Sequence, residues 1–383
     1  MIMKLIFTGD VNFRNMYHMN EQIASEILEN VLPYTKQADF RIVNLEEPLA
    51  DVDKYEPIYK SGPNLIAPQS CVSFLDVLGV DVAVLANNHT GDYGDGAIKD
   101  TLALLDAHGI KHTGAGKNID EAYNSVILEK DGTKVSILSV CENEFGIATE
   151  TKYGSAGYNA RRLLNKIKSE KERADVVIVV FHGGNEYNPL PAPVAVDRYR
   201  LICDMGADAL IAMHTHCPQG FETYNGKPIV YSMGNFLFQS STEKAPDSSW
   251  FYGYMSVLNI DTDKKISLEV VPYNYYLGNR INIFEGKDKE KMMAYLNKIS
   301  DIIQDPEELH RYYMGWCCGY RSFPKPVSEY GGLKGTFAAA KNLLTCEAHC
   351  DKLRENYRIL NDGEEDLARE YEIKARELMK MPV

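Results

Sequence analysis

The chain has 383 residues, of which 45% are hydrophobic and 25% are charged, and its formal net charge is −13. These values are ordinary for a soluble globular protein, and the length allows a sizeable core. The acidic balance argues against binding to nucleic acid, because that affinity depends on basic patches. It leaves room for a small-molecule or polyanionic substrate, since bound divalent cations can reverse the local field.

Cysteine usage and hydropathy indicate the cellular compartment in which the protein is expected. The eight cysteines show no CxxC spacing, so we expect free thiols in a reducing environment. Cys346 and Cys350 are four residues apart on a predicted helix and could share a face, but two thiols alone make a poor metal site. The chain shows neither a signal-peptide pattern nor a run of about 18 apolar residues. We therefore expect a cytoplasmic protein without membrane insertion.

Residues 1–280 alternate short apolar runs with helix-like stretches, which predicts an α/β domain. The predicted strands are Lys4–Thr8, Phe40–Asn44, Val82–Ala86, Ser125–Glu129, Val135–Val140, Val176–Phe181, Ala209–Met213, Pro228–Ser232, Tyr254–Ile260 and Ser267–Pro272. The predicted helices are Glu21–Leu32, Gln69–Leu78, Gly96–His108, Ala160–Arg173 and Val194–Met205.

Two patterns indicate the kind of sheet. The run Val176–Phe181 is apolar throughout, which is typical of a strand buried on both faces. The segments Val257–Ile260 and Ser267–Val271 flank a polar turn and predict an antiparallel hairpin. The sheet is therefore predicted to be mixed.

The character of the chain changes after about residue 285. Charged helical patterns cover Asp288–Ile303, Thr336–Leu360 and Glu364–Leu378, so residues 281–383 are predicted to form a helical extension packed on a domain of residues 1–280. The aromatic segment Tyr312–Tyr330 is expected to serve core packing, with an approach to a pocket as the alternative.

The pair His214 and His216 follows a strand-like run directly. On an extended segment, residues i and i+2 point the same way, so both imidazoles are expected to face one site. Imidazole is the commonest side-chain metal ligand, and two convergent rings are a sound start for a metal site.

Further candidate ligands follow other predicted strands. They are Asp10, Glu46, Asn88, His89 and His182. Ligands of α/β folds collect at the carboxyl ends of strands. Taken singly, Asp10 could be a cap and Asn88 part of a turn. Taken together, the set predicts a metal-dependent enzyme with one or two divalent ions, and its mix of donors favours Mn, Fe or Zn. Glu46 is the candidate bridge between two ions.

These motifs resemble, in the same order, those of the CapA family of capsule and poly-γ-glutamate synthesis proteins, which are similar to calcineurin-like metallophosphoesterases. The motifs are Thr8-Gly-Asp10, Asn44-Leu-Glu46, Asn87-Asn-His89, His182-Gly-Gly-Asn-Glu-Tyr187, His214-Thr-His216 with Gln219, and Tyr231-Ser-Met-Gly-Asn-Phe236. The resemblance covers roughly residues 1–260, and no motif covers the C-terminal third.

The resemblance implies a four-layer α-β-β-α sandwich of the metallophosphoesterase type with a dinuclear metal site at its edge. It implies that Asp10 and His216 bind one ion, that Glu46 bridges, and that His89 orients the scissile group or protonates the leaving oxygen. The second ion would be bound by Asn88, His182 and His214. Residues near the ligands or in contact with substrate would be Asn12, Glu186, Tyr187, Gln219 and Asn235.

One departure concerns Asn12, which stands where the wider superfamily has histidine. An amide is a weaker ligand than imidazole, so whether an ion occupies the first metal site is left open.

Hydrolysis of a phosphoester is the function that this set of residues favours. A component of poly-γ-glutamate or capsule biosynthesis or degradation is the alternative, as is a non-catalytic binding protein. A polyanion would need a basic groove, for which the candidates are Arg161, Arg162, Arg198, Arg200 and Lys227. The substrate, the oligomeric state, with a homo-oligomer as one option, and the role of the C-terminal helices remain open.

Overall fold

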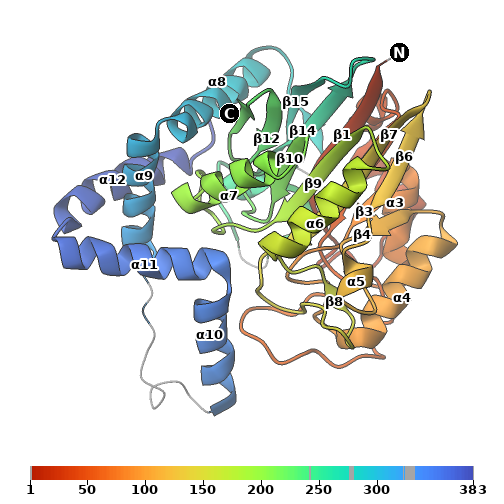
Figure 1. Ribbon diagram of the computed structural model, residues 1–383, viewed down its shortest axis with the longest axis horizontal. Coiled ribbons are helices and arrows are strands. Elements are labelled where there is room, and N and C mark those ends of the chain that lie inside the picture. The colour runs from red at the N-terminus through yellow and green to blue at the C-terminus, as the bar shows by residue number, and fades with distance from the viewer. Residues whose placement is uncertain (1, 241–242, 276–279, 322, 324–332, 383) are drawn as a thin grey trace.

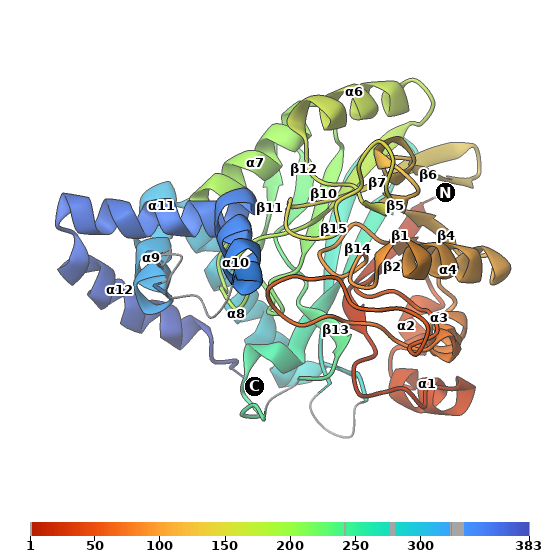
Figure 2. The ribbon, with the colours of Figure 1, turned by 90° about the horizontal axis from the view of Figure 1, so that it is seen from below.

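Two β-sheets pack face to face and are covered by helices on their outer faces (Figures 1 and 2). The computed structural model describes residues 2–240, 243–275, 280–321, 323 and 333–382. In Figure 2, α6 and α7 lie on one side of the strands and α1 to α4 on the opposite side. This arrangement confirms the predicted four-layer α-β-β-α sandwich with a helical C-terminal region.

The first sheet has the strand order β16-β15-β14-β1-β2-β3-β4, and β13 pairs with β1 beyond the end of its pairing with β14. Its strands are β1 (Met3–Asn12), β2 (Phe40–Leu45), β3 (Val82–Val84), β4 (Lys111–Thr113), β13 (Asn235–Phe238), β14 (Tyr252–Ile260), β15 (Ile266–Asn274) and β16 (Asn282–Ile283). β1 to β4 are parallel, whereas β14 and β15 form an antiparallel hairpin. The predicted mixed sheet and hairpin are therefore confirmed.

The second sheet has the order β11-β12-β10-β9-β7-β6. Its strands are β6 (Val126–Lys130), β7 (Thr133–Cys141), β9 (Val176–His182), β10 (Ala209–Met213), β11 (Phe221–Tyr224) and β12 (Lys227–Val230). Every residue of β9 is buried, as its unbroken apolar run predicted. The short strands β5 (Ala115–Gly116) and β8 (Gly154–Ser155) pair separately.

The helices cover the two outer faces. They are α1 (Glu21–Leu28), α2 (Leu32–Thr35), α3 (Val72–Leu78), α4 (Gly94–Ala107), α5 (Ile119–Ala122), α6 (Ala160–Lys171) and α7 (Pro193–Asp204), with 3-10 turns η1 (Gln69–Cys71) and η2 (Ser249–Phe251). Alternation along β1 shows why both faces need cover: Leu5 and Phe7 belong to the core between the sheets, whereas Ile6 belongs to the core beneath α1 and α3.

The C-terminal helices pack on the sandwich and share its main core (Figure 1). They are α8 (Gly286–Gln304), α9 (Pro306–Gly319), α10 (Leu333–Thr345), α11 (Glu347–Asp362) and α12 (Glu365–Leu378). The single helix predicted over Thr336–Leu360 is wrong, because the backbone is extended at Cys346, with φ −74° and ψ 128°. Neither glycine nor proline marks this break in the sequence. Part of the predicted loop and of the aromatic segment, residues 324–332, lies outside the described residues.

No helix in the described part of the chain has the length and apolar character needed to cross a membrane.

The sequence indicated only a turn at residues 231–236, but Asn235–Phe238 form β13, a strand parallel to β1. The register between β1 and β13 shifts between Asp10 and Val11, so the β1 backbone is irregular at this point. Gly9 permits the close approach, because a Cβ atom there would lie 1.8 Å from the carbonyl oxygen of Gly234. The position of Asp10 therefore depends on a glycine immediately before it.

Replacing Gly9 with alanine is expected to lower the free energy of unfolding by about 2–3 kcal/mol, because the backbone of β13 must move away. Gly109→Ala is the control: its φ is +69°, but its Cβ would meet open space, so we expect a loss of about 1 kcal/mol. Urea unfolding of both variants measures the difference. Equal losses at the two positions would show that the close approach of β13 to Gly9 does not set the loss in the free energy of unfolding.

Candidate metal centre

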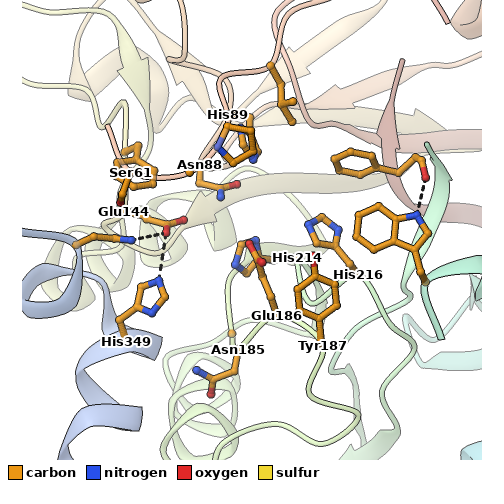
Figure 3. A pocket seen from close by; sticks show the side chains of 18 of the residues that line it. Ser61, Asn88, His89, Glu144, Asn185, Glu186, Tyr187, His214, His216 and His349 are labelled. Atoms are coloured by element: carbon orange, nitrogen blue, oxygen red, sulfur yellow. Dashed lines mark hydrogen bonds and ion pairs between the residues drawn. The ribbon is translucent and has the colours of Figure 1, made fainter. Parts of the chain in front are cut away.

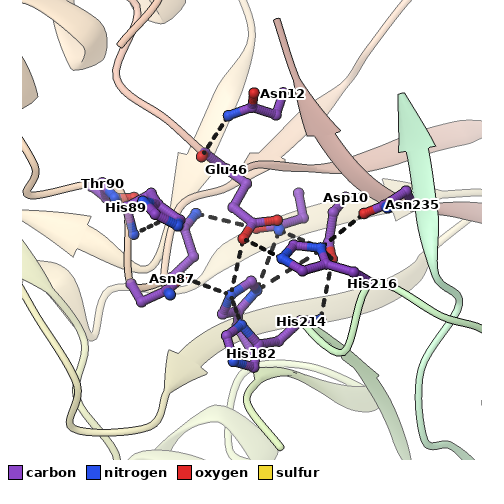
Figure 4. A network of polar contacts seen from close by, with 12 residues as sticks. Asp10, Asn12, Glu46, Asn87, His89, Thr90, His182, His214, His216 and Asn235 are labelled. Carbon is purple, nitrogen blue, oxygen red and sulfur yellow. Dashed lines mark hydrogen bonds and ion pairs between the residues drawn. The ribbon is translucent and has the colours of Figure 1, made fainter. Parts of the chain in front are cut away.

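The predicted ligands meet where strands of both sheets end (Figure 4). Asp10 lies in β1, and Glu46 directly follows β2. From the second sheet, His182 is the last residue of β9, and His214 directly follows β10. Parallel strands within each sheet end at the same edge, so residues far apart in the sequence are brought to one place.

Two groups of three side chains could each hold a metal ion, and both contain Glu46. One group is Asp10, Glu46 and His216, and the other is Glu46, His182 and His214; in each, the ligand atoms lie within 4.8 Å of one another. Glu46 Oε1 is 3.6 Å from His182 Nε2 and 4.0 Å from His216 Nε2. The geometry thus places the Glu46 carboxylate between two potential ions.

The carboxylate of Glu46 is the least satisfied group in the site. It is fully buried, and neither oxygen has a hydrogen-bond partner among the residues that the structure describes. Burial, and then the nearby charge of Asp10, raise its pKa well above the usual range. An unpaired carboxylate at such a place costs several kcal/mol unless a proton or a cation neutralises it. The donors present therefore fit a divalent cation.

His214 and His216 converge for a different reason than the sequence suggested. β10 ends at Met213, and the two histidines have φ values of 111° and 55°, so the segment is a turn and not an extended strand. Backbone in this region is strained for residues other than glycine, and such strain is typically kept at functional sites. The prediction that alternation along a strand aligns the two imidazoles is thus wrong, although both rings do reach the site.

The second group is tightly gathered around His182. Its Nε2 atom is 2.9 Å from His214 Nδ1 and 3.1 Å from Asn88 Oδ1. Asn88, predicted as a ligand, therefore presents its amide oxygen to the same point as the two imidazoles. Asn44, at the end of β2, contacts both His182 Nδ1 and Asp10 Oδ1, which fixes the relative positions of the two groups.

Asn235 and Asn12, predicted as substrate contacts, are fully buried and bind protein atoms instead. Asn235 Oδ1 is 2.9 Å from His216 Nδ1 and can accept its proton, which leaves Nε2 as the ring nitrogen available to a metal. Asn12 donates to the carbonyl oxygen of Glu46 and accepts from the backbone of Arg14. Both positions favour support of the site over contact with a substrate.

Gln219 is likewise buried, and its side chain donates to the carbonyl oxygen of Asn188. Glu186 and Tyr187, in contrast, line the pocket above the metal-ligand groups, together with Asn88, His214 and His216. Only two of the five predicted substrate contacts therefore face the space that a substrate would occupy.

His89 also lines the pocket and is held by a buried chain of charged groups. Its Nδ1 atom is 2.6 Å from Asp92 Oδ2, and Asp92 Oδ1 is 2.5 Å from Lys60 Nζ. The Lys60 side chain is only 1% exposed, although it comes from the long connection after β2. Lys60 Nζ is also 3.2 Å from His89 Nδ1, so both partners lie at this nitrogen, and Nε2 is left for a substrate.

The pocket has a volume of about 460 Å³, and the C-terminal helices build one of its walls (Figure 3). Four cationic side chains line it: Arg14, Lys60, Lys244 and Lys352. Tyr187 stacks on Trp250 with ring centroids 6.0 Å apart, and Trp316 stacks on Tyr320 at 4.9 Å. The last pair comes from the aromatic segment expected to serve packing, so this segment both packs and reaches the pocket. No sequence motif indicated Trp250, Lys244 or Lys352.

The basic groove predicted from other residues does not form at this pocket. Arg162 pairs with Asp120, Arg198 with Glu142, and Arg200 with Glu222. Lys227 binds the carbonyl oxygen of Cys203, and Arg161 lines a separate surface hollow beside α6. The positive charge near the metal-ligand groups instead comes from loops and from α11.

Metal binding is expected to weaken as the pH falls below about 7. Burial raises the pKa of Asp10 to about 7 and that of Glu46 well above its usual range, so protons must leave both groups when a cation binds. The histidines add little to the pH dependence of metal binding above about pH 5, because burial lowers the pKa of His214 and His216 to about 4. We expect roughly tenfold lower affinity per pH unit for each displaced proton.

Calorimetric titration with Mn²⁺ at about pH 6 and pH 8, in buffers of different ionisation enthalpy, measures both the affinity and the protons released. An affinity independent of pH, without proton release, would contradict this account of the carboxylates.

The chain is similar in sequence to capsule biosynthesis proteins of two bacilli. The capsule biosynthesis protein CapA of Bacillus anthracis is 31% identical over 280 residues, covering 71% of this chain and 67% of that protein. The PGA biosynthesis protein CapA of Bacillus subtilis (strain 168) is 28% identical over 256 residues, covering 65% and 66%. The chain thus spans about two thirds of the length of both relatives.

Among solved structures, a phosphatase from Mycoplasma pneumoniae is 17% identical with a TM-score of 0.46, covering 71% of this chain and 93% of that one. A 5'-nucleotidase precursor from Thermus thermophilus is 12% identical with a TM-score of 0.42, covering 79% and 60%. Both likenesses are distant, so the family assignment is made from sequence. The family model described as bacterial capsule synthesis protein PGA_cap matches residues 4–240. Because this match spans more than half of the chain and includes all the candidate metal ligands, the chain belongs to the bacterial capsule synthesis protein PGA_cap family.

Proposed function

We propose that the protein is a metal-dependent hydrolase of the phosphoesterase type, acting at the centre bridged by Glu46. The observation that carries this proposal is the Glu46 carboxylate, buried without a hydrogen-bond partner among the described residues, between two groups of potential ligands. A structural role alone does not account for a buried charge of this kind, whereas a shared position between two cations does.

The two groups define which residues would hold the ions. Asp10 and His216 would bind the first ion, with Glu46 shared; Asn88, His182 and His214 would bind the second. This mixture of carboxylate, amide and imidazole suits Mn, Fe or Zn. When bound, such ions lower the pKa of a coordinated water and neutralise the charge that develops on the scissile group.

His89 would deliver the proton to the leaving oxygen. Asp92 occupies Nδ1, so the proton is transferred from Nε2, and the fixed ring orientation keeps that atom toward the substrate. Lys60 pairs with the other oxygen of Asp92, so the carboxylate that orients the imidazole is itself held in position. General acid catalysis of this kind contributes about 10²–10⁴-fold to the rate.

The pocket supports an anionic substrate despite the net charge of −13. Arg14, Lys244 and Lys352 line it beside Glu144 and Glu186, and its aromatic walls offer flat apolar surface next to the cations. A second candidate function follows from the same charges: a role in capsule or poly-γ-glutamate metabolism, as the names of the relatives suggest, with the polymer carboxylates bound along the cationic rim. A phosphoester-cleaving step and a polymer-binding rim are compatible in one pocket.

The double variant His214→Ala/His216→Ala is expected to lose the ions, because it removes one imidazole from each ligand group. Elemental analysis of protein purified without chelator should find one to two equivalents of Mn, Fe or Zn in the centre of the wild type and a loss of these in the variant. His108→Ala/His112→Ala, which changes two histidines bound to surface carboxylates, is the matched control. A wild type that contains no metal after reconstitution would contradict the hydrolase proposal.

His89→Ala is expected to lower kcat for phosphoester hydrolysis by about 10²–10⁴-fold without changing the metal content, because His89 belongs to neither ligand group. Asp92→Asn should lower kcat less, since the imidazole stays in place but its tautomer is no longer fixed. Steady-state kinetics with chromogenic phosphomonoesters and phosphodiesters in Mn²⁺, Fe²⁺ and Zn²⁺ test both. If the wild type, loaded with each metal in turn, hydrolysed none of these phosphoesters, the phosphoesterase proposal would be wrong.

Binding of poly-γ-glutamate at moderate salt is expected to weaken at least tenfold in Lys244→Ala/Lys352→Ala, because these side chains supply charge at the pocket rim. Lys287→Ala/Lys289→Ala, on the exposed face of α8, is the control for nonspecific charge. Fluorescence anisotropy with labelled polymer provides the measurement. Equal weakening in both variants would mean that the polymer contacts the surface generally and not the pocket.

A further inference from the structure

A second cluster of metal-ligating side chains joins the C-terminal helices to the sandwich. Glu144 lies in the connection between β7 and β8, Cys346 lies between α10 and α11, and His349 lies in the first turns of α11. One ligand atom from each of the three lies within 4.8 Å of the others. Figure 3 shows Glu144 and His349 facing one another across the pocket rim. The cluster shares no residue with the groups around Glu46.

The spacing within the cluster is compatible with ligands of one ion. His349 Nε2 is 3.3 Å from Glu144 Oε1, a long hydrogen bond, and Asn342 Nδ2 donates to the same oxygen at 3.0 Å. Tetrahedral zinc with bonds of about 2.0–2.3 Å places its ligand atoms roughly 3.3–3.7 Å apart. An ion could therefore enter between the imidazole and the carboxylate with little movement of either side chain.

Negative charge is concentrated around the cluster. Glu142 Oε2 is 3.6 Å from Cys346 Sγ, and Glu347 binds the backbone and side chain of Asn143 beside them. Arg198, a buried cation at this junction, already pairs with Glu142 and with Asp351 on α11. A further cation at this junction would offset the remaining carboxylate charge.

The Cys346 thiol has Glu142 Oε2 as its acceptor at 3.6 Å, whereas His349 is only partly satisfied. The Nδ1 atom of His349 is buried and has no hydrogen-bond partner within the described part of the chain. Thiolate, imidazole and carboxylate together are a donor set that selects zinc among the common divalent cations.

We propose that Glu144, Cys346 and His349 bind a Zn²⁺ ion that fastens the α10–α11 junction to the β7–β8 connection. Glu144 and His349 also line the pocket, so water or an anionic group there would complete the coordination of the ion. Asn342 on α10 and Lys352 on α11 line the same pocket, and the ion would hold both in place. The proposal is independent of hydrolysis, because the two sites have different ligands.

Cobalt substitution tests the proposal directly. Co²⁺ bound by a cysteine thiolate gives a charge-transfer absorption in the near ultraviolet, and the groups around Glu46 contain no cysteine. In the His214→Ala/His216→Ala background, under reducing conditions, we expect about one equivalent of Co²⁺ and this absorption. Adding Cys346→Ser should abolish the absorption, whereas Cys350→Ser should leave it unchanged, because Cys350 Sγ contacts the carbonyl oxygen of Leu343 outside the cluster.

The proposal would be overturned if the His214→Ala/His216→Ala protein showed no thiolate absorption, or if the absorption persisted after Cys346→Ser was added.

Thermal unfolding gives a second readout. Zn²⁺ should raise the Tm of the His214→Ala/His216→Ala protein but not that of the same protein with Cys346→Ser. If Cys346→Ser fails to fold, His349→Gln on the same background replaces it, with loss of the Zn²⁺-dependent shift as the expected result. An unchanged shift in a folded His349→Gln protein would count against the site.

Discussion

The carboxyl group of Glu46 is fully buried where the two sheets meet, and the other polar groups of the site are arranged around it. β2 delivers this carboxylate from one sheet, and β9 and β10 deliver imidazoles from the other. A charge at that depth requires neutralisation, and the surrounding groups are arranged so that cations on either side would supply it. Asn44 and Asn235 hold Asp10 and the histidines in position by hydrogen bonds, so the buried polar groups are ordered before any ion binds.

Close backbone packing supports this arrangement. Gly9 lets β13 approach β1 beside Asp10, and the strained turn after β10 brings His214 and His216 to the same point. Both features cost conformational free energy, which the sandwich core offsets by burying the strands on both faces. The site is therefore rigid where the ligands lie, while the pocket above it is built from loops and from helices α9 to α11.

The C-terminal helices give the pocket much of its chemical character. Trp316, Asn342 and Lys352 come from this region and line the pocket beside residues of the sandwich. Arg198 ties α7 to α11 through Asp351, and the cluster around Glu144 lies at the same junction. The extension thus belongs to the site as well as to the core.

Apolar periodicity and polar residues at strand ends were enough to predict the α/β class, the mixed sheet, the hairpin and the six candidate ligands that gather at the centre. The sequence could not distinguish Asn235, which orients His216, from Glu186, which lines the pocket, because each follows a predicted strand by a few residues. The break at Cys346, the contacts among Lys60, Asp92 and His89, and the meeting of Glu144 with His349 became known from the structure. The side-chain contacts join segments that are well separated in the chain. They depend on how the layers pack, and local patterns carry no information about that.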